Sequence, residues 1–176
     1  MLKHNIQSLT IPQSLEMVLI DELVKLSTQS IRTKAHITQD NAFLCLDDKT
    51  GKKAFASYNI LEIFAQSLAL WRSLQEQNLH SNATPQSPST LKNLIDTQNK
   101  SKLGFLLGAR GFEIFAPFVE VGQSIEAILR VNMQDESGLG VYEGEAFVNG
   151  KMIAKTSLTA LNPNDEFLSQ IMQDNN

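Results

Sequence analysis

The sequence predicts a single α+β domain in which an antiparallel sheet curls around one long helix. Strand-like segments come first, a helix-like segment with a broad apolar face follows, and strand-like segments joined by tight turns complete the pattern. With 176 residues, 42% of them hydrophobic, the chain is long enough to bury one core. A single helix is enclosed only if the sheet bends around it, so a flat sheet is not expected.

The first strands are predicted at residues 17–26 and 31–37. The former segment is apolar and β-branched, and the latter alternates apolar with polar side chains, the period of a half-buried strand. The short link at residues 27–30 predicts a hairpin. Residues 47–53, rich in Asp, Lys and Gly, are predicted to form a turn or loop.

A buried helix is predicted over residues 58–77, with Ser57 or Asn59 as its N-cap. Its apolar side chains recur at helical spacing: Ile60, Leu61, Phe64, Leu68, Trp71 and Leu74. Residues 78–98 are polar and rich in Pro and Ser, which predicts a loop, with a short helical turn at residues 91–95.

Further strands are predicted at residues 103–116, 122–135, 139–149 and 151–161. Gly138–Gly140 and Asn149-Gly150 are the expected turns, and Asn-Gly between apolar runs is a strong hairpin signal. Asn162-Pro163 ends the last strand. We therefore assign residues 1–163 to one domain and residues 164–176 to a polar tail.

Composition excludes several classes of function. A net charge of −4 without a basic stripe argues against nucleic-acid binding. No apolar run is long enough for a membrane span, and the first residues lack a signal sequence, so a cytoplasmic protein is expected. Cys45, the single cysteine, forms no internal disulfide, is predicted to be a small core residue, and belongs to no metal-ligand spacing. Neither a metal nor another cofactor is expected. His4, His36 and His80 are predicted in structural or solvent-exposed positions, with His36 facing solvent.

Four groups of residues resemble the motifs of one family, the 3-hydroxyacyl-ACP dehydratases (ACP, acyl carrier protein). The groups, in order, are Pro12 with Met17, Leu19, Ile20 and Asp21; Glu62 with Ala65 and Gln66; Gly104–Arg110 with Phe112, Pro117, Val121, Gly122 and Ile125; and Gln134–Glu136 with Gly138–Glu143. The last group resembles a narrower branch, the dehydratase-like subunit of aryl polyene biosynthesis. Their order and spacing over most of the chain make the resemblance specific.

The resemblance implies the hotdog fold and an acid/base site at a seam between two subunits. In the family, a His directly after the Pro takes the α-proton of the 3-hydroxyacyl thioester, and a helix carboxylate protonates the departing hydroxyl. Carried over by position, Glu62 is the carboxylate, and Gln13 stands in the His slot. Because an amide does not titrate near neutral pH, Gln13 is not a general base. We expect Gln13 and Glu62 within about 10 Å of each other across the seam, the scale of a two-group site.

The resemblance also places a substrate-binding region at the start of the helix. Backbone amides at Ser57 and Tyr58 would polarise the thioester carbonyl, and Gln66 would tie the helix to a neighbouring backbone. The family usually has a Gly near this point, whereas this chain reads Ala56-Ser57-Tyr58, which weakens the expected approach to the thioester.

Three hypotheses follow for the function. In the first, the chain is a catalytically impaired subunit that pairs with a complete hotdog dehydratase, so that the partner's His faces Glu62. In the second, it is an active dehydratase or thioesterase that relies on Glu62 and water. In the third, it is an acyl-binding or scaffold homodimer without catalytic activity. Each implies an acyl carrier protein substrate and a homodimer or heterodimer. Lys100, Lys102 and Arg110 are the candidate docking cluster for the carrier, or else a solvated loop edge.

Overall fold

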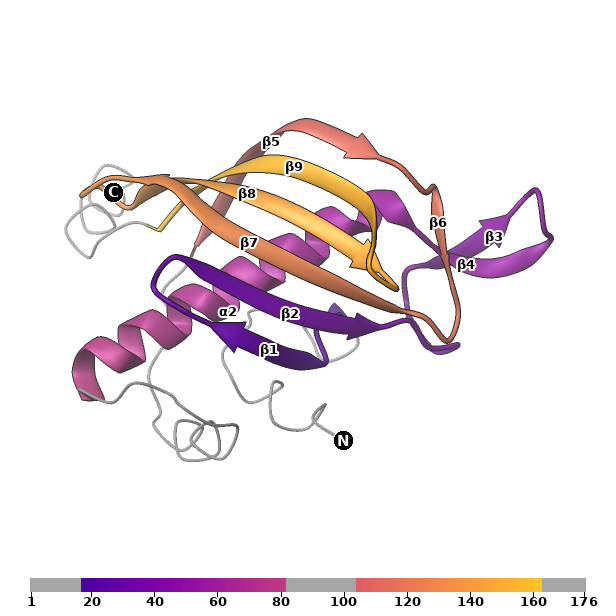
Figure 1. Cartoon of the computed structure of the whole chain (residues 1–176), viewed down its shortest axis with the longest axis horizontal. Helices are drawn as coiled ribbons and strands as arrows, with labels where there is room; N and C mark the ends of the chain where they lie inside the picture. Colours follow the sequence, from indigo (N-terminus) through magenta and orange to yellow (C-terminus); the bar gives the residue numbers. More distant parts are fainter. Residues whose placement is uncertain (1–16, 82–103, 163–176) are drawn as a thin grey trace, which may run out of the picture.

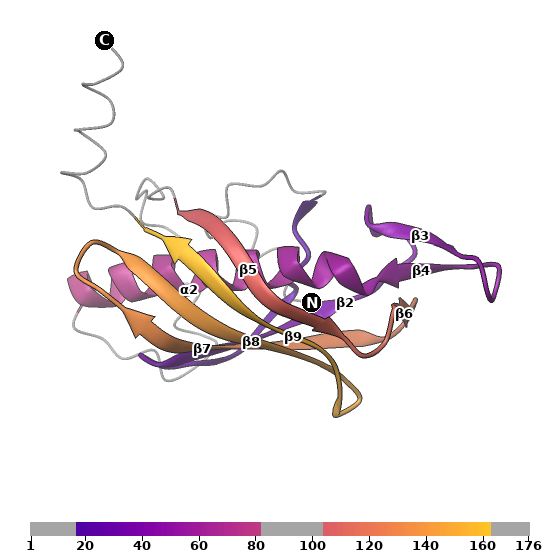
Figure 2. The same ribbon diagram turned by 90° about the horizontal axis from the view of Figure 1, so that it is seen from above.

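The computed structural model describes residues 17–81, with the backbone alone for 76–81, and residues 104–162. It confirms the α+β class and the hotdog fold. A six-stranded antiparallel sheet, in the order β1-β2-β7-β8-β9-β5, curls around helix α2 (Ile60–Ser81), and a three-stranded sheet, β3-β4-β6, lies beside the start of that helix (Figures 1 and 2). The predicted tail, the helical turn at 91–95 and the domain boundary at 163 lie outside the described residues.

The predicted first hairpin is present as β1 (Glu22–Leu26) and β2 (Ser30–His36). The prediction that the strand begins at residue 17 is wrong: β1 begins at Glu22, although the Asp21 N–H still donates to the Lys34 carbonyl of β2 at 2.9 Å. The carboxamide of Gln66 binds this segment at Leu19, and the Asp21 carboxylate accepts the backbone N–H of His36 at 2.6 Å. An apolar, β-branched composition therefore did not suffice to make residues 17–21 a strand.

Residues 47–53, predicted as a turn or loop, belong to a hairpin that the sequence did not reveal. Strands β3 (Leu44–Asp47) and β4 (Lys52–Ala56) pair with each other, and β4 pairs on its other side with the short strand β6 (Phe118–Glu120). Only the turn between Asp47 and Gly51 fits the prediction, and the Asp47 carboxylate stabilises it by accepting the Lys49 N–H at 3.0 Å. The strand ends are lysine-rich and short, so their composition resembles that of a loop.

The predicted helix is confirmed and is longer than expected. A 3-10 turn, η2 (Ser57–Asn59), leads into α2. Ala56 is the cap of the 3-10 turn, without a side-chain cap hydrogen bond. Of the two predicted N-caps of α2, Ser57 is wrong, because its Oγ has no partner among the described residues, whereas Asn59 stays a prediction. The Ser57 side chain is buried, and the Asn59 carboxamide donates to the Phe43 carbonyl at 3.5 Å.

The later strands are β5 (Phe105–Ile114), β7 (Ser124–Gln134), β8 (Leu139–Val148) and β9 (Lys151–Leu161). The last three form a meander, and β5 lies on the far side of β9 as an edge strand. The turn predicted at Asn149-Gly150 is confirmed, with φ of 51° and 76°, as in a type I′ hairpin turn. The strand ends at Leu161, one residue before Asn162, as predicted.

The core lies between α2 and the inner face of the six-stranded sheet. The largest fully buried side chains among the described residues are Phe55, Phe64, Ile31, Ile37, Ile60, Ile63, Leu70, Leu74, Ile125, Leu129, Tyr142 and Leu158. Trp71 of α2 packs edge-on against Tyr142 of β8, with ring centroids 5.8 Å apart. Gly144 of β8 lies under the helix: a Cβ there would stand 3.2 Å from the Phe64 ring, so bare backbone sets how closely the helix approaches the sheet.

Candidate functional site

The side chain of Gln66 connects α2 to the segment that leads into β1. Its Oε1 accepts the N–H of Leu19 at 2.8 Å, and its Nε2 donates to the Met17 carbonyl at 2.8 Å and to Oε1 of Glu62 at 2.8 Å. The predicted tie between this helix residue and a neighbouring backbone is therefore confirmed. Gln66 is fully buried, so it would contact a substrate only if these bonds were broken.

Glu62 lies one turn before Gln66, in the first turn of α2. The four-residue spacing brings the two side chains to the same face of the helix, and this i, i+4 pattern is visible in the sequence. The Glu62 side chain is partly buried, and the Gln66 amide donates to it.

The start of the helix offers a buried hydroxyl and one backbone donor that is already occupied. Ser57 is fully buried, and among the described residues its Oγ has no hydrogen-bond partner. Its backbone N–H donates to the Pro117 carbonyl at 2.9 Å, so that amide does not point at a vacant position. Tyr58, the next residue, is 60% exposed. The structure thus places Ser57 and Tyr58 close in the chain to Glu62, with the hydroxyl of one buried and the ring of the other in solvent.

Gln13, the residue predicted in the His slot, lies outside the described residues. The nearest described position in the chain is Met17, whose carbonyl accepts the Gln66 amide. The predicted separation of Gln13 and Glu62 therefore stays a prediction.

His36 does not face the Glu62 side of the fold. In β2 the side chains of Ile31, Thr33 and Ala35 are buried toward α2, whereas His36 lies on the opposite face of the sheet and is half-exposed, as the alternation predicted. Its ring bridges two neighbouring strands, with Nδ1 2.7 Å from Ser124 Oγ and Nε2 3.0 Å from Glu22 Oε1. The hydrogen bond from His36 is the main cause that lowers the pKa of Glu22, and the nearby Lys34 charge adds to it. His4 and the side chain of His80 are outside the described residues.

Cys45 is not the core residue that the sequence predicted. It lies on β3, outside the main core, is partly buried, and its Sγ lies 3.7 Å from the Ala54 carbonyl across the hairpin. Within residues 17–81 and 104–162 no three His, Cys, Asp or Glu side chains come together as a metal site. No helix in the described part of the chain is long and apolar enough to cross a membrane.

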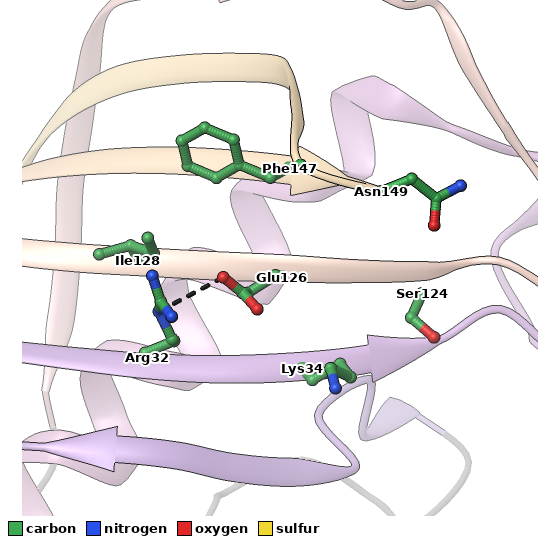
Figure 3. Close-up of a pocket in the computed structure, with 8 residues that line it drawn as sticks. Arg32, Lys34, Ser124, Glu126, Ile128, Phe147 and Asn149 are labelled. Carbon is green, nitrogen blue, oxygen red and sulfur yellow. Dashed lines mark ion pairs between the residues drawn. The ribbon is translucent and has the colours of Figure 1, made fainter.

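A polar groove lies on the outer face of the large sheet and is separate from the helix site. Figure 3 shows the Arg32 guanidinium beside the Glu126 carboxylate, with Nε and Oε1 3.3 Å apart, and Lys34 and Ser124 farther along the groove. Because α2 covers the other face of the sheet, this groove does not open toward Glu62.

The curled sheet, its buried central helix and the carboxylate in the first turn of that helix define a hotdog protein of the dehydratase type. The chain matches the ApeP-like family, described as ApeP dehydratase, over residues 5–173 and belongs to that family. This confirms the aryl polyene branch of the dehydratase-like hotdog proteins that the sequence motifs indicated.

Solved structures share this fold over most of the chain. The dehydratase heterocomplex ApeI:P from Xenorhabdus doucetiae is 20% identical, with 96% of each chain covered and a TM-score of 0.69. The HP0420 homologue from Helicobacter felis is 15% identical, covering 89% of this chain and 87% of the other, with a TM-score of 0.55. Cj0977, a virulence protein from Campylobacter jejuni, is 9% identical, covering 92% and 87%, with a TM-score of 0.55. A search of curated proteins finds no significant match.

Proposed function

We propose that this chain is a cytoplasmic dehydratase-like subunit that acts on 3-hydroxyacyl thioesters of an acyl carrier protein. It contributes the carboxylate of Glu62, while a second hotdog dehydratase subunit contributes the general base. Gln13 in the slot of the base leaves the chain by itself a poor catalyst, since an amide does not take up a proton near neutral pH.

The hydrogen-bond chain through Gln66 is the observation that carries this proposal. It links the Glu62 carboxylate to the backbone at Met17 and Leu19, only a few residues after the Gln13 position. A residue whose donors and acceptor are all used in this way fixes the relative position of the helix carboxylate and the entry segment. Such rigid support is what an acid/base site requires, because proton transfer depends on sub-ångström placement of the groups.

The proposed reaction removes water from the 3-hydroxyacyl chain. A base takes the α-proton, the electron pair forms the α,β double bond, and the C–O bond of the 3-hydroxyl breaks. Protonated Glu62 donates its proton to the departing hydroxyl, which leaves as water. The Ser57 hydroxyl, buried at the helix start and without a partner among the described residues, is the proposed donor to the thioester carbonyl; since the residue is fully buried, the helix start must open when the acyl chain enters.

Strand β5 is the proposed surface for the partner subunit. It is ten residues long, lies at the edge of the large sheet, and nearly all of its side chains are exposed. Large apolar groups are among them or next to them: Phe105, Leu106, Leu107, Ile114 and Phe115. A long apolar edge strand invites pairing with another chain, and a second hotdog sheet would cover it. The ApeI:P neighbour is itself a heterocomplex of dehydratases, which supports this assembly.

The decisive experiment measures dehydration of a 3-hydroxyacyl-ACP by the chain alone and by its complex with a second hotdog dehydratase. Alone, the wild type should be nearly inactive, and Gln13→His should raise the rate by about 10²–10⁴, the usual size of a general-base contribution. Gln13→Asn is the matched control and should gain nothing. In the complex, Glu62→Gln should abolish activity, whereas the same change of the partner's helix carboxylate should not.

Three results would contradict the proposal in whole or in part. Ordinary dehydration rates from the wild-type chain alone would mean that another base exists and that the chain is an active enzyme in its own right. A complex that keeps full activity with Glu62→Gln would remove Glu62 from the reaction. If Gln13→His gains nothing while the fold and assembly persist, the helix start also fails to bind the thioester, and a binding subunit is the better description.

A further inference from the structure

The hairpin of β3 and β4 extends away from the body of the fold as a narrow arm (Figures 1 and 2). Its base is fixed on both sides: Phe55 and Val119 at the pairing of β4 with β6 are buried in the core. Toward the tip, residues 48–53 are all exposed. The arm is therefore a rigidly anchored projection whose outer half contacts no other part of the described core.

Basic residues at the end of this arm differ from several basic residues on the large sheet. Arg32, Arg130 and Lys155 on the large sheet each form a salt bridge with a glutamate. Lys49, Lys52 and Lys53 form no salt bridge with the described residues. The pKa of the Asp47 carboxyl is lowered, mainly by the hydrogen bond from the Thr50 hydroxyl and also by the nearby charge of Lys49. Within the described residues, the lysine side chains of the arm therefore have no acidic partner in an ion pair.

An apolar side chain accompanies these charges on one face. Leu46 is directly opposite Lys53 in the register of the hairpin and is 61% exposed. The Lys49 N–H and the Thr50 hydroxyl hold the Asp47 carboxylate in its own turn, and because these bonds lower its pKa, it stays charged. Together with the exposed Asp48 it leaves the three lysines of the arm with an excess of one positive charge. An exposed leucine beside lysines gives this face an apolar contact and a local positive charge, which is complementary to an acidic partner.

The second strand of the arm continues directly into the helical segment that holds the proposed site. β4 ends at Ala56, Ser57 follows, and Glu62 lies in the next helical turn. At a rise of about 3.3 Å per residue, the Cα atom of Lys53 lies about 10 Å from that of Ala56, the last residue before the helical turn. A protein held on the arm would therefore stand beside the start of α2, where exposed Tyr58 lies next to buried Ser57.

We propose that the β3–β4 arm is the docking surface for the acidic carrier protein that delivers the acyl thioester, with Lys49, Lys53 and Leu46 as its contacts. This inference rests on the proposed function and assigns the docking to a different place from the cluster of Lys100, Lys102 and Arg110. The chain as a whole carries a net charge of −4, so the attraction must be local, and with a screening length of about 8 Å at physiological salt the arm acts as a separate patch.

The test compares two variants with the same change in charge, each in the complex with the second hotdog subunit. Lys49→Glu/Lys53→Glu changes the arm, and Lys25→Glu/Lys151→Glu changes two exposed lysines on β1 and at the start of β9. The KM for a 3-hydroxyacyl-ACP should rise roughly 10- to 30-fold in the arm variant, because two weak attractions become repulsions, and less than about threefold in the control. Lys49→Gln/Lys53→Gln should fall between them, and added salt should narrow all the differences.

A substrate without the carrier separates docking from chemistry. On a 3-hydroxyacyl-pantetheine thioester, the arm variant should match the wild type. Equal effects of the arm and control variants on the carrier substrate, or an equal loss on both substrates, would overturn the docking proposal while leaving the role of Glu62 intact. If no complex turns over the pantetheine substrate, the proposed function fails. The docking surface is then tested by binding of the holo carrier protein, measured by fluorescence anisotropy. Weaker binding to the arm variant than to the wild type would support the docking surface, and equal binding would overturn it.

Discussion

Replacing Gln66 with leucine should destabilise the fold and release the segment before β1. The leucine fills a similar volume but removes both the acceptor for the Leu19 N–H and the donor to the Met17 carbonyl. The structure offers no other group in the same place, because the same carboxamide makes all three bonds, including the one to Glu62. The entry segment would then lose its polar contacts with α2.

The expected loss of folding stability follows from how deeply the two backbone groups that lose their hydrogen-bond partner are buried. The Leu19 N–H belongs to a residue only 4% exposed, whereas the Met17 carbonyl belongs to one that is 40% exposed. A buried backbone group without a partner costs about 1–3 kcal/mol, and a partly exposed one regains water and costs less. We therefore expect Gln66→Leu to lower the free energy of unfolding by about 2–4 kcal/mol.

Gln75→Ala provides a matched control on the same helix. Its Nε2 donates to the Ser27 carbonyl at 3.0 Å, but Trp71 Nε1 donates to the same oxygen at 2.9 Å. That carbonyl keeps a partner in the variant, so the loss should stay near 0.5–1 kcal/mol, the net value of one ordinary hydrogen bond. Urea unfolding gives both free energies, and amide hydrogen exchange reports the Leu19 N–H directly.

Two outcomes would refute this reasoning. One is a cost for Gln66→Leu no greater than that of Gln75→Ala. The other is a Leu19 amide that exchanges as slowly in the variant as in the wild type, which would show that another group had been holding the segment.

Two further predictions concern packing and pH. Gly144→Ala should lower the free energy of unfolding by about 1–3 kcal/mol, because the new methyl group would stand 3.2 Å from the Phe64 ring. Thermal unfolding should show a lower midpoint temperature. An unchanged midpoint would mean that the helix shifts to make room at no cost. The pKa of Glu22 in the folded state is lowered below its ordinary value of 4.5, chiefly by the hydrogen bond from His36, so the stability it contributes is present above about pH 4.5 and is lost as the pH falls through the lowered pKa. Unfolding by urea between pH 3 and 7 should therefore show a smaller loss toward acid for Glu22→Gln than for the wild type, and parallel curves would contradict the assignment.

The sequence by itself determined the class of fold, the position of the central helix and the strands of the meander. These elements are long or strongly periodic, so local spacing decides them: Phe64 and Trp71 repeat at helical intervals, and Asn149-Gly150 specifies a hairpin turn. The motifs also singled out Glu62 and Gln66, each with its own role; the hydrogen bond between them came only from the structure, although their i, i+4 spacing allows it.

Tertiary structure alone decided what long-range contacts control. The segment before Glu22 is not a strand, although it is as apolar as one, because the Gln66 carboxamide, 47 residues away in the chain from Leu19, takes the backbone group that a neighbouring strand would have used. The β3–β4 hairpin exists because β6 pairs with β4 from more than 60 residues away, whereas its lysine-rich ends look like a loop. Periodicity encodes which face of an element is apolar, but it does not encode which distant group will satisfy a backbone hydrogen bond, and those partners fixed the entry segment, the arm and the surroundings of Glu62.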